Sequence, residues 1–105
     1  MPLVATPTYS ATKAAIHSWS QSLREQFRHT AVEVIEIAPP GVATDLMPGH
    51  AENPRSMPLD EYINETMSQL EAQAPENLVE RVKPLRFAER DGRYQEIFAM
   101  VNPRD

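Results

Sequence analysis

The chain has 105 residues, of which 41 % are hydrophobic and 24 % charged, with a net charge of −5 and no cysteine. This composition predicts a single small folded domain, residues 1–105, and excludes disulfides, thiolate zinc sites and cysteine nucleophiles. Scattered basic residues in an acidic chain disfavour nucleic-acid binding, and the lack of a signal-peptide pattern or of a membrane span of roughly 20 apolar residues predicts a cytoplasmic protein.

The first predicted element is a long amphipathic helix from Ser10 to His29. Apolar residues recur at every fourth position and form one face of this helix: Ala11, Ala15, Trp19, Leu23 and Phe27. Ile16 widens this apolar stripe. Thr6 followed by Pro7, or Thr8 two residues later, is a candidate helix start, because a hydroxyl can accept an orphan N–H and proline suits the first helical position.

The next predicted element is a strand, VEVIEIA, from Val32 to Ala38. It is rich in β-branched residues and stops at Pro39 and Pro40, which cannot donate hydrogen bonds to a neighbouring strand. Its apolar residues do not alternate cleanly with polar ones, which favours a parallel strand covered on both faces. A helix followed by such a strand indicates an α/β fold.

The second half of the chain is predicted to be mostly helical. Residues 42–57 read as a long loop, and Pro58 to Gln73 as a second helix with Leu59, Ile63, Met67 and Leu70 on its apolar face. Three shorter elements follow: a short strand from Leu78 to Val82, a helical turn from Pro84 to Arg90, and a terminal helix from Arg93 to Val101, with a strand as the alternative for the last.

Tyr9 and Lys13 are the candidate catalytic residues. A spacing of four places them one turn apart on the same side of the first helix. An ammonium group near a phenol favours the phenolate, which lets a tyrosine exchange a proton with a carbonyl or alcohol. Such a pair also arises by chance, so its context decides the interpretation.

The context resembles one family. The segments that carry the resemblance are YSATK from Tyr9 to Lys13, SLR at 22–24, VEV at 32–34 and PGVATD from Pro40 to Asp45. In this order they resemble the short-chain dehydrogenases/reductases, and LDEYI and RVKPLRFAE look most like the subgroup related to DltE-type oxidoreductases. The resemblance spans nearly the whole chain.

The resemblance implies a set of roles. Tyr9 would be the general acid/base, and Lys13 would favour its phenolate and bind the nicotinamide ribose of NAD or NADP. Four residues would line the nicotinamide site: Pro40, Gly41, Val42 and Thr44. The loop from Leu46 to Met57 would cover the substrate. The location agrees with the rule that open α/β sheets bind ligands at the carboxyl ends of their strands.

Other parts of the family's fold are not found in this sequence. The chain has only Gly41, Gly49 and Gly92, which cannot form a glycine-rich pyrophosphate turn. The family's catalytic serine precedes the tyrosine by roughly a dozen residues, and Ser10, which follows it, cannot be that serine. We therefore expect a partial Rossmann-type, helix-rich α/β fold, equivalent to the C-terminal part of the enzyme. We also expect the isolated chain to be inactive and to bind no cofactor.

Three functional hypotheses stay open. The chain is a fragment of an NAD(P)-dependent oxidoreductase, a non-catalytic self-associating module, or a fragment that complements a separate N-terminal half. We expect the chain to form a homo-oligomer, a dimer or tetramer, through the helix from about Ser10 to His29. No metal site is expected, because His17, His29 and His50 lack useful spacing and no carboxylate cluster joins them.

Overall fold

The computed structural model describes residues 1–104 and has the predicted α/β class, rich in helix with a small parallel sheet. Its elements are α1 (Pro7–Gln26), β1 (Glu36–Ile37), α2 (Leu59–Glu71), β2 (Glu76–Asn77), the 3₁₀ helix η1 (Glu80–Val82), α3 (Lys83–Arg86) and α4 (Tyr94–Val101). Two compact units divide the chain: one comprises Met1–Val34 with Pro84 and the residues after it, and the other Ile35–Lys83. Within the described residues, no helix has both the length and the apolar character to cross a membrane.

Helix α1, in the first unit, confirms the predicted long helix with shifted ends. It begins at Pro7, because proline is pre-set for the first helical position and the N–H of Ser10 already donates to the carbonyl of Thr6 over 3.0 Å. The hydroxyl of Thr6 makes no capping bond. The helix ends at Gln26 rather than His29, since the hydroxyl of Thr30 donates to the carbonyl of Phe27 and closes a turn there.

The predicted apolar stripe of α1 does not face the core of its unit. Trp19 is 62 % exposed and Ile16 48 %, while Ser20 is buried and donates its hydroxyl to the carbonyl of Ile16 over 2.8 Å. The side of α1 buried in this chain is therefore centred on a small polar residue. The periodicity predicted a helix correctly, but it did not predict which side packs.

Helix α4 confirms the predicted terminal helix of the first unit. It follows a turn at Gly92, whose φ of 70° lies in the left-handed region where glycine is unstrained. Hydrogen bonds from the Arg93 guanidinium lower the pKa of the exposed Glu96 carboxyl at its start. Ile97 is buried, and the rings of Tyr94 and Phe98 stack with centroids 5.9 Å apart.

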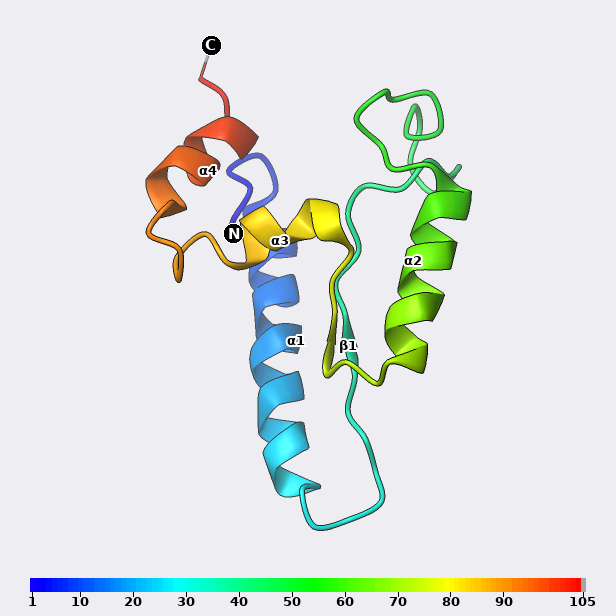
Figure 1. Cartoon of the computed structure of the whole chain (residues 1–105). Helices are drawn as coiled ribbons and strands as arrows, with labels where there is room; N and C mark the ends of the chain where they lie inside the picture. Colours follow the sequence, from blue (N-terminus) through cyan, green and yellow to red (C-terminus); the bar gives the residue numbers. More distant parts are fainter. Residues whose placement is uncertain (105) are drawn as a thin grey trace. The chain divides into compact units, whose positions relative to one another are not determined.

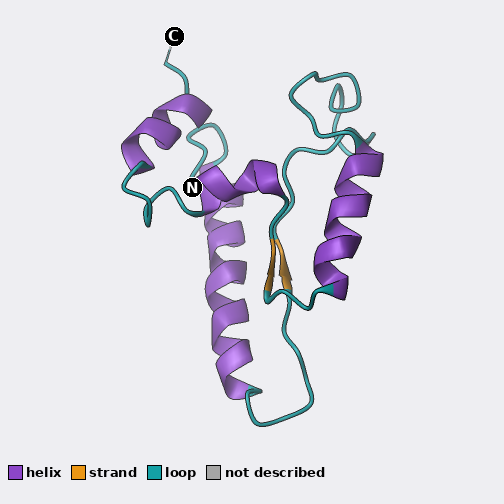
Figure 2. Ribbon diagram, viewed as in Figure 1, coloured by secondary structure: helices purple, strands orange, loops and turns teal. Residues whose placement is uncertain are grey.

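The second unit contains the parallel pair β1 and β2, drawn side by side in Figure 2, with Glu36 opposite Glu76 and Ile37 opposite Asn77. The predicted strand from Val32 to Ala38 is thus reduced to two residues, because the partner segment offers hydrogen bonds only from Pro75 to Asn77. Covering on both faces is also not observed, since Ile37 is 48 % exposed.

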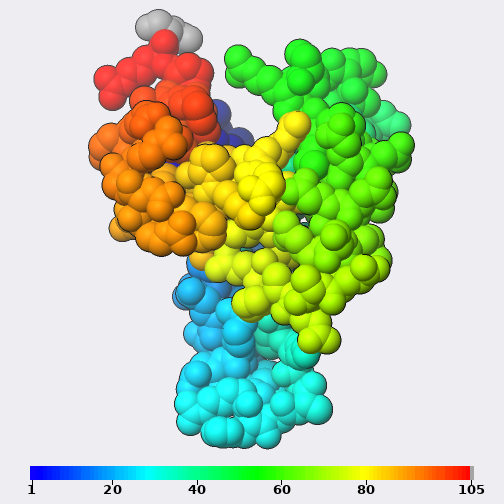
Figure 3. Space-filling view, in the orientation of Figure 1, coloured from blue at the N-terminus to red at the C-terminus, as the bar shows by residue number. Residues whose placement is uncertain are grey.

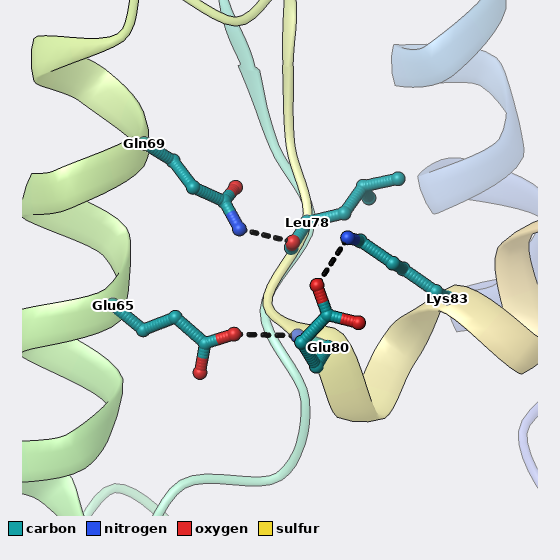
Figure 4. Close-up of polar contacts among 5 residues, drawn as sticks. All are labelled: Glu65, Gln69, Leu78, Glu80 and Lys83. Carbon is teal, nitrogen blue, oxygen red and sulfur yellow. Dashed lines mark hydrogen bonds and ion pairs between the residues drawn. The ribbon is translucent and has the colours of Figure 1, made fainter.

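The predicted strand from Leu78 to Val82 is wrong, because its backbone groups bond to side chains of α2 instead of another strand. The carboxylate of Glu65 accepts the N–H of Glu80 over 2.6 Å, and the amide of Gln69 donates to the carbonyl of Leu78 (Figure 4). An ion pair between Glu80 and Lys83 then spans one turn of helix.

The core of the second unit lies between α2 and the residues after β2. Its apolar members are Met57, Leu78, Val79 and Val82. Asn77, 2 % exposed, donates its side-chain amide to the carbonyl of Thr66 on α2 over 3.1 Å. This bond fixes the sheet against α2, since a buried amide is costly without a partner.

Truncating Val79 tests this core. Val79 is 1 % exposed, so Val79→Ala should lower the free energy of unfolding of the second unit by about 2 kcal/mol, through lost apolar burial and a small cavity. Leu46→Ala in the same unit, where the side chain is 86 % exposed, is the control and should change it little. Urea unfolding followed at amides of α2 measures both; equal effects would contradict the assigned core.

Candidate active site

Tyr9 and Lys13 lie together in the first turns of α1. The ammonium nitrogen of Lys13 is 5.3 Å from the centroid of the Tyr9 ring, and the ring is 58 % exposed. The hydroxyl of Thr12 donates to the carbonyl of Tyr9 over 2.7 Å. An exposed phenol with a cation at its ring is placed to exchange a proton with a molecule bound outside the helix.

The residues before α1 form a short arch, residues 2–6, that sequence reasoning did not connect with the site. The N–H of Leu3 donates to the hydroxyl of Ser10 over 2.9 Å, next to Tyr9. The N–H of Val4 donates to the side-chain oxygen of Asn102 over 2.8 Å. No signal in the sequence relates Asn102 to the start of α1, because 98 residues separate Val4 and Asn102.

The predicted nicotinamide segment, residues 40–44, lies in the second unit at the carboxyl end of β1. Gly41 and Val42 are connected to Met57 by a parallel bridge: the carbonyl of Gly41 accepts the N–H of Met57 over 2.7 Å, and the N–H of Ala43 donates to the carbonyl of Met57 over 2.9 Å. The hydroxyl of Thr44 accepts the N–H of Leu46 over 3.4 Å. The segment therefore has a fixed backbone next to its strand.

Gly41 stands out because its own surroundings do not require glycine. Its φ is not in the left-handed region, and a Cβ built on it would meet no atom within 4 Å. A glycine in such a place leaves backbone open for the close approach of another molecule.

The predicted substrate loop, residues 46–57, begins and ends within the second unit. Leu46 is 86 % exposed and Met47 54 %, while Met57 at its end is buried. Asn53 accepts the N–H of Arg55 over 2.9 Å, and the Arg81 guanidinium donates to the carbonyl of Arg55 over 3.2 Å. Apolar side chains at the start of a loop with a fixed end are suited to contacting an apolar molecule.

The structure thus brings Tyr9 and Lys13 together in the first unit, and Pro40, Gly41, Val42 and Thr44 together in the second. Ser10, excluded as the catalytic serine, accepts a hydrogen bond from the arch.

Two of the histidines considered for metal binding make hydrogen bonds with arginine side chains. The ring of His17 forms a hydrogen bond with the Arg86 guanidinium. His29 accepts a hydrogen bond from Arg28 over 3.0 Å.

Comparisons with known proteins agree on one family. The family described as short chain dehydrogenase matches residues 1–55, a range that holds Tyr9, Lys13 and the segment 40–44. The chain is 40 % identical over 108 residues to the uncharacterized oxidoreductase DltE of Bacillus subtilis, covering 99 % of this chain and 42 % of that protein. It is 36 % identical over 59 residues to the short-chain dehydrogenase RED1 of Pyricularia oryzae, covering 56 % of this chain and 21 % of RED1.

The chain therefore spans less than half the length of these relatives. No solved structure gives a significant match.

Proposed function

Because this chain belongs to the short-chain dehydrogenase family, we propose that it provides the proton-transfer part of an NAD(P)-dependent oxidoreductase acting on a carbonyl or alcohol. The observation that carries the proposal is the Tyr9 phenol on α1, exposed and paired with Lys13. The matched range of the family includes both residues.

In the proposed reaction the nicotinamide supplies or accepts the hydride. Tyr9 donates its phenolic proton to the oxygen of the substrate carbonyl as the alcohol forms, and takes the proton back in the reverse direction. Lys13 would stabilise the negative charge that develops on the phenol oxygen as the proton leaves, and would bind the ribose of the cofactor. Both tasks need an ammonium one helical turn from the phenol, which is the observed spacing.

The segment 40–44 is proposed to bind the nicotinamide. Its position at the carboxyl end of a parallel strand, and the open space beside Gly41, support this role. The exposed apolar residues Leu46 and Met47 would contact the substrate from the adjoining loop.

A chimera tests the proposed function. This chain would replace the matching 42 % of Bacillus subtilis DltE, and the oxidation of NADH and NADPH would be followed with a panel of aldehydes and ketones. Turnover that depends on Lys13, lost with Lys13→Met and retained with the control Lys83→Met, which removes a half-buried ammonium in the second unit, is the expected result. A folded chimera that binds cofactor and turns over equally in both variants would refute the assignment.

The 105-residue chain alone should show no saturable binding of NAD(H) or NADP(H). Binding a dinucleotide requires a glycine-rich turn at a helix N-terminus for its pyrophosphate, which these 105 residues do not provide. Titration calorimetry measures this directly, with the DltE chimera as the positive control. One site of micromolar affinity on the isolated chain would contradict the prediction.

A second candidate function is a self-associating, non-catalytic module. The exposed apolar residues of α1, including Ile16 and Trp19, favour a homo-oligomer, a dimer or tetramer, formed through this helix. The second half of α1, light blue to cyan, is visible on the face drawn in Figure 3. Oligomerisation is compatible with catalysis, so Lys13→Met in the chimera separates the two functions.

The third hypothesis, a fragment that complements a separate N-terminal half, is tested by co-expression. The chain and the remaining part of DltE would be produced together as two polypeptides, and turnover that needs both would support the hypothesis.

We also propose a cytoplasmic location for the oxidoreductase, because the reaction uses the NAD(P)H held inside the cell.

A further inference from the structure

Asn102, at the end of α4, joins the two ends of the first unit. Its side-chain oxygen accepts the N–H of Val4 over 2.8 Å, and its side-chain amide donates to the carbonyl of Pro2 over 3.0 Å. The same amide donates to the carbonyl of Phe98 over 3.1 Å, and the backbone N–H of Asn102 donates to that carbonyl over 3.0 Å. Asn102 therefore ends α4 and at the same time binds the backbone of the arch, residues 2–6.

The arch in turn binds the start of α1. The N–H of Thr6 donates to the carbonyl of Leu3 over 3.1 Å, and the N–H of Leu3 donates to the hydroxyl of Ser10 over 2.9 Å. Since the hydroxyl of Thr6 makes no capping bond, the first turn lacks the local device that usually fixes a helix start. The hydrogen bond from the N–H of Leu3 to the hydroxyl of Ser10 is instead the side-chain contact that ties the arch to this turn, next to Tyr9.

We propose that Asn102 is a positioning residue for Tyr9. A side-chain amide is suited to this task because it accepts and donates in one plane, and so pairs with the N–H of Val4 and the carbonyl of Pro2 together. Through the arch and Ser10, Asn102 fixes the turn from which the phenol projects. Asn102 does not itself act in proton transfer.

Hydrogen exchange of the 105-residue chain tests the structural part of the proposal. With Asn102→Leu, backbone amides of the arch and of the first turn of α1 should exchange about tenfold faster or more, while those of α2 stay unchanged. Asn102→Asp keeps the acceptor for Val4 and removes the donor to Pro2, so it should give a smaller increase. Asn64→Asp, exposed on α2, is the matched control.

Unchanged exchange at Leu3, Val4 and Ser10, whose N–H groups are all hydrogen-bonded, in either Asn102 variant would overturn the proposal. So would faster exchange spread equally over both units, which would show a general loss of stability instead of a local one. If Asn102→Leu does not fold, the exchange rates of Asn102→Asp test the proposal, because its carboxylate still accepts the N–H of Val4 and lacks only the donor to Pro2.

Kinetics of the DltE chimera test the effect on Tyr9, and this part rests on the proposed function. Asn102→Asp should lower kcat about tenfold and leave the KM for the cofactor unchanged, because a small displacement of the proton donor affects the chemical step alone. An unchanged kcat would overturn the positioning role. A wild-type chimera without turnover would refute the proposed function instead, and the exchange at Ser10, next to Tyr9, would then decide the role of Asn102.

Discussion

Tyr9→Phe in the DltE chimera is expected to lower kcat by about a hundred- to ten-thousandfold, the usual contribution of a general acid or base. Phenylalanine keeps the ring beside Lys13, whose ammonium is 5.3 Å from the centroid, so the change removes little besides the transferable proton. The affinity for NAD(P)H should therefore stay nearly the same. Steady-state kinetics combined with fluorescence titration of the cofactor measure both quantities.

Tyr94→Phe is the matched control for this variant. Tyr94 lies at the start of α4, where its ring stacks on Phe98, and phenylalanine preserves that stack. The control should retain full turnover. If the Tyr9 variant also retained it, Tyr9 would have no part in proton transfer, and the family resemblance at this position would carry no catalytic meaning for this chain.

Trp19→Glu is expected to convert a dimer or tetramer of this chain into a folded monomer. Trp19 is 62 % exposed and lies about two turns before Phe27 on the same stripe, with Leu23 between them, so the stripe offers a partner helix two aromatic contacts. Loss of such a residue from an interface typically weakens association about thirtyfold or more, and a buried carboxylate adds to the loss. Sedimentation velocity at micromolar concentration measures the change.

The control for the added charge is Gln21→Glu, also on α1 and exposed. It should leave the oligomer intact. Circular dichroism of the Trp19 variant should show unchanged helix content, because the side chain is exposed in the single chain and does not belong to its core. A wild-type chain that sediments as a monomer would exclude α1 as a self-association surface.

Local pattern predicted helices better than strands, for a physical reason. The presence of α1 and α4 follows from periodicity and turn residues, which act within a few residues, although the ends of α1 differ from those predicted. A strand exists only where a partner provides hydrogen bonds, and β1 has such a partner only over Glu36–Ile37. The β-branched residues from Val32 to Ile35 could not reveal that limit.

The candidate site was predictable to the extent that its chemistry is local. Tyr9 and Lys13 share one helical turn, and Gly41 lies a few residues after β1, behind two prolines, so spacing and residue type pointed to them. Asn102 was not predictable, because its contacts with Pro2 and Val4 arise only when the chain folds back over nearly its whole length. A single asparagine near a helix end gives no sequence pattern from which backbone partners so far away in the chain could be predicted.

The bridge between Gly41, Ala43 and Met57 has a consequence for how this protein can diversify. It holds the two ends of the segment 44–56 next to each other, so the segment forms a loop that is closed at its base. Insertions, deletions or grafted sequences there would change what the loop recognises without altering β1 or the start of α2, because a longer loop adds only a small closure entropy. The proposed substrate contacts of this loop can therefore change independently of Tyr9 and Lys13, the proposed proton-transfer pair.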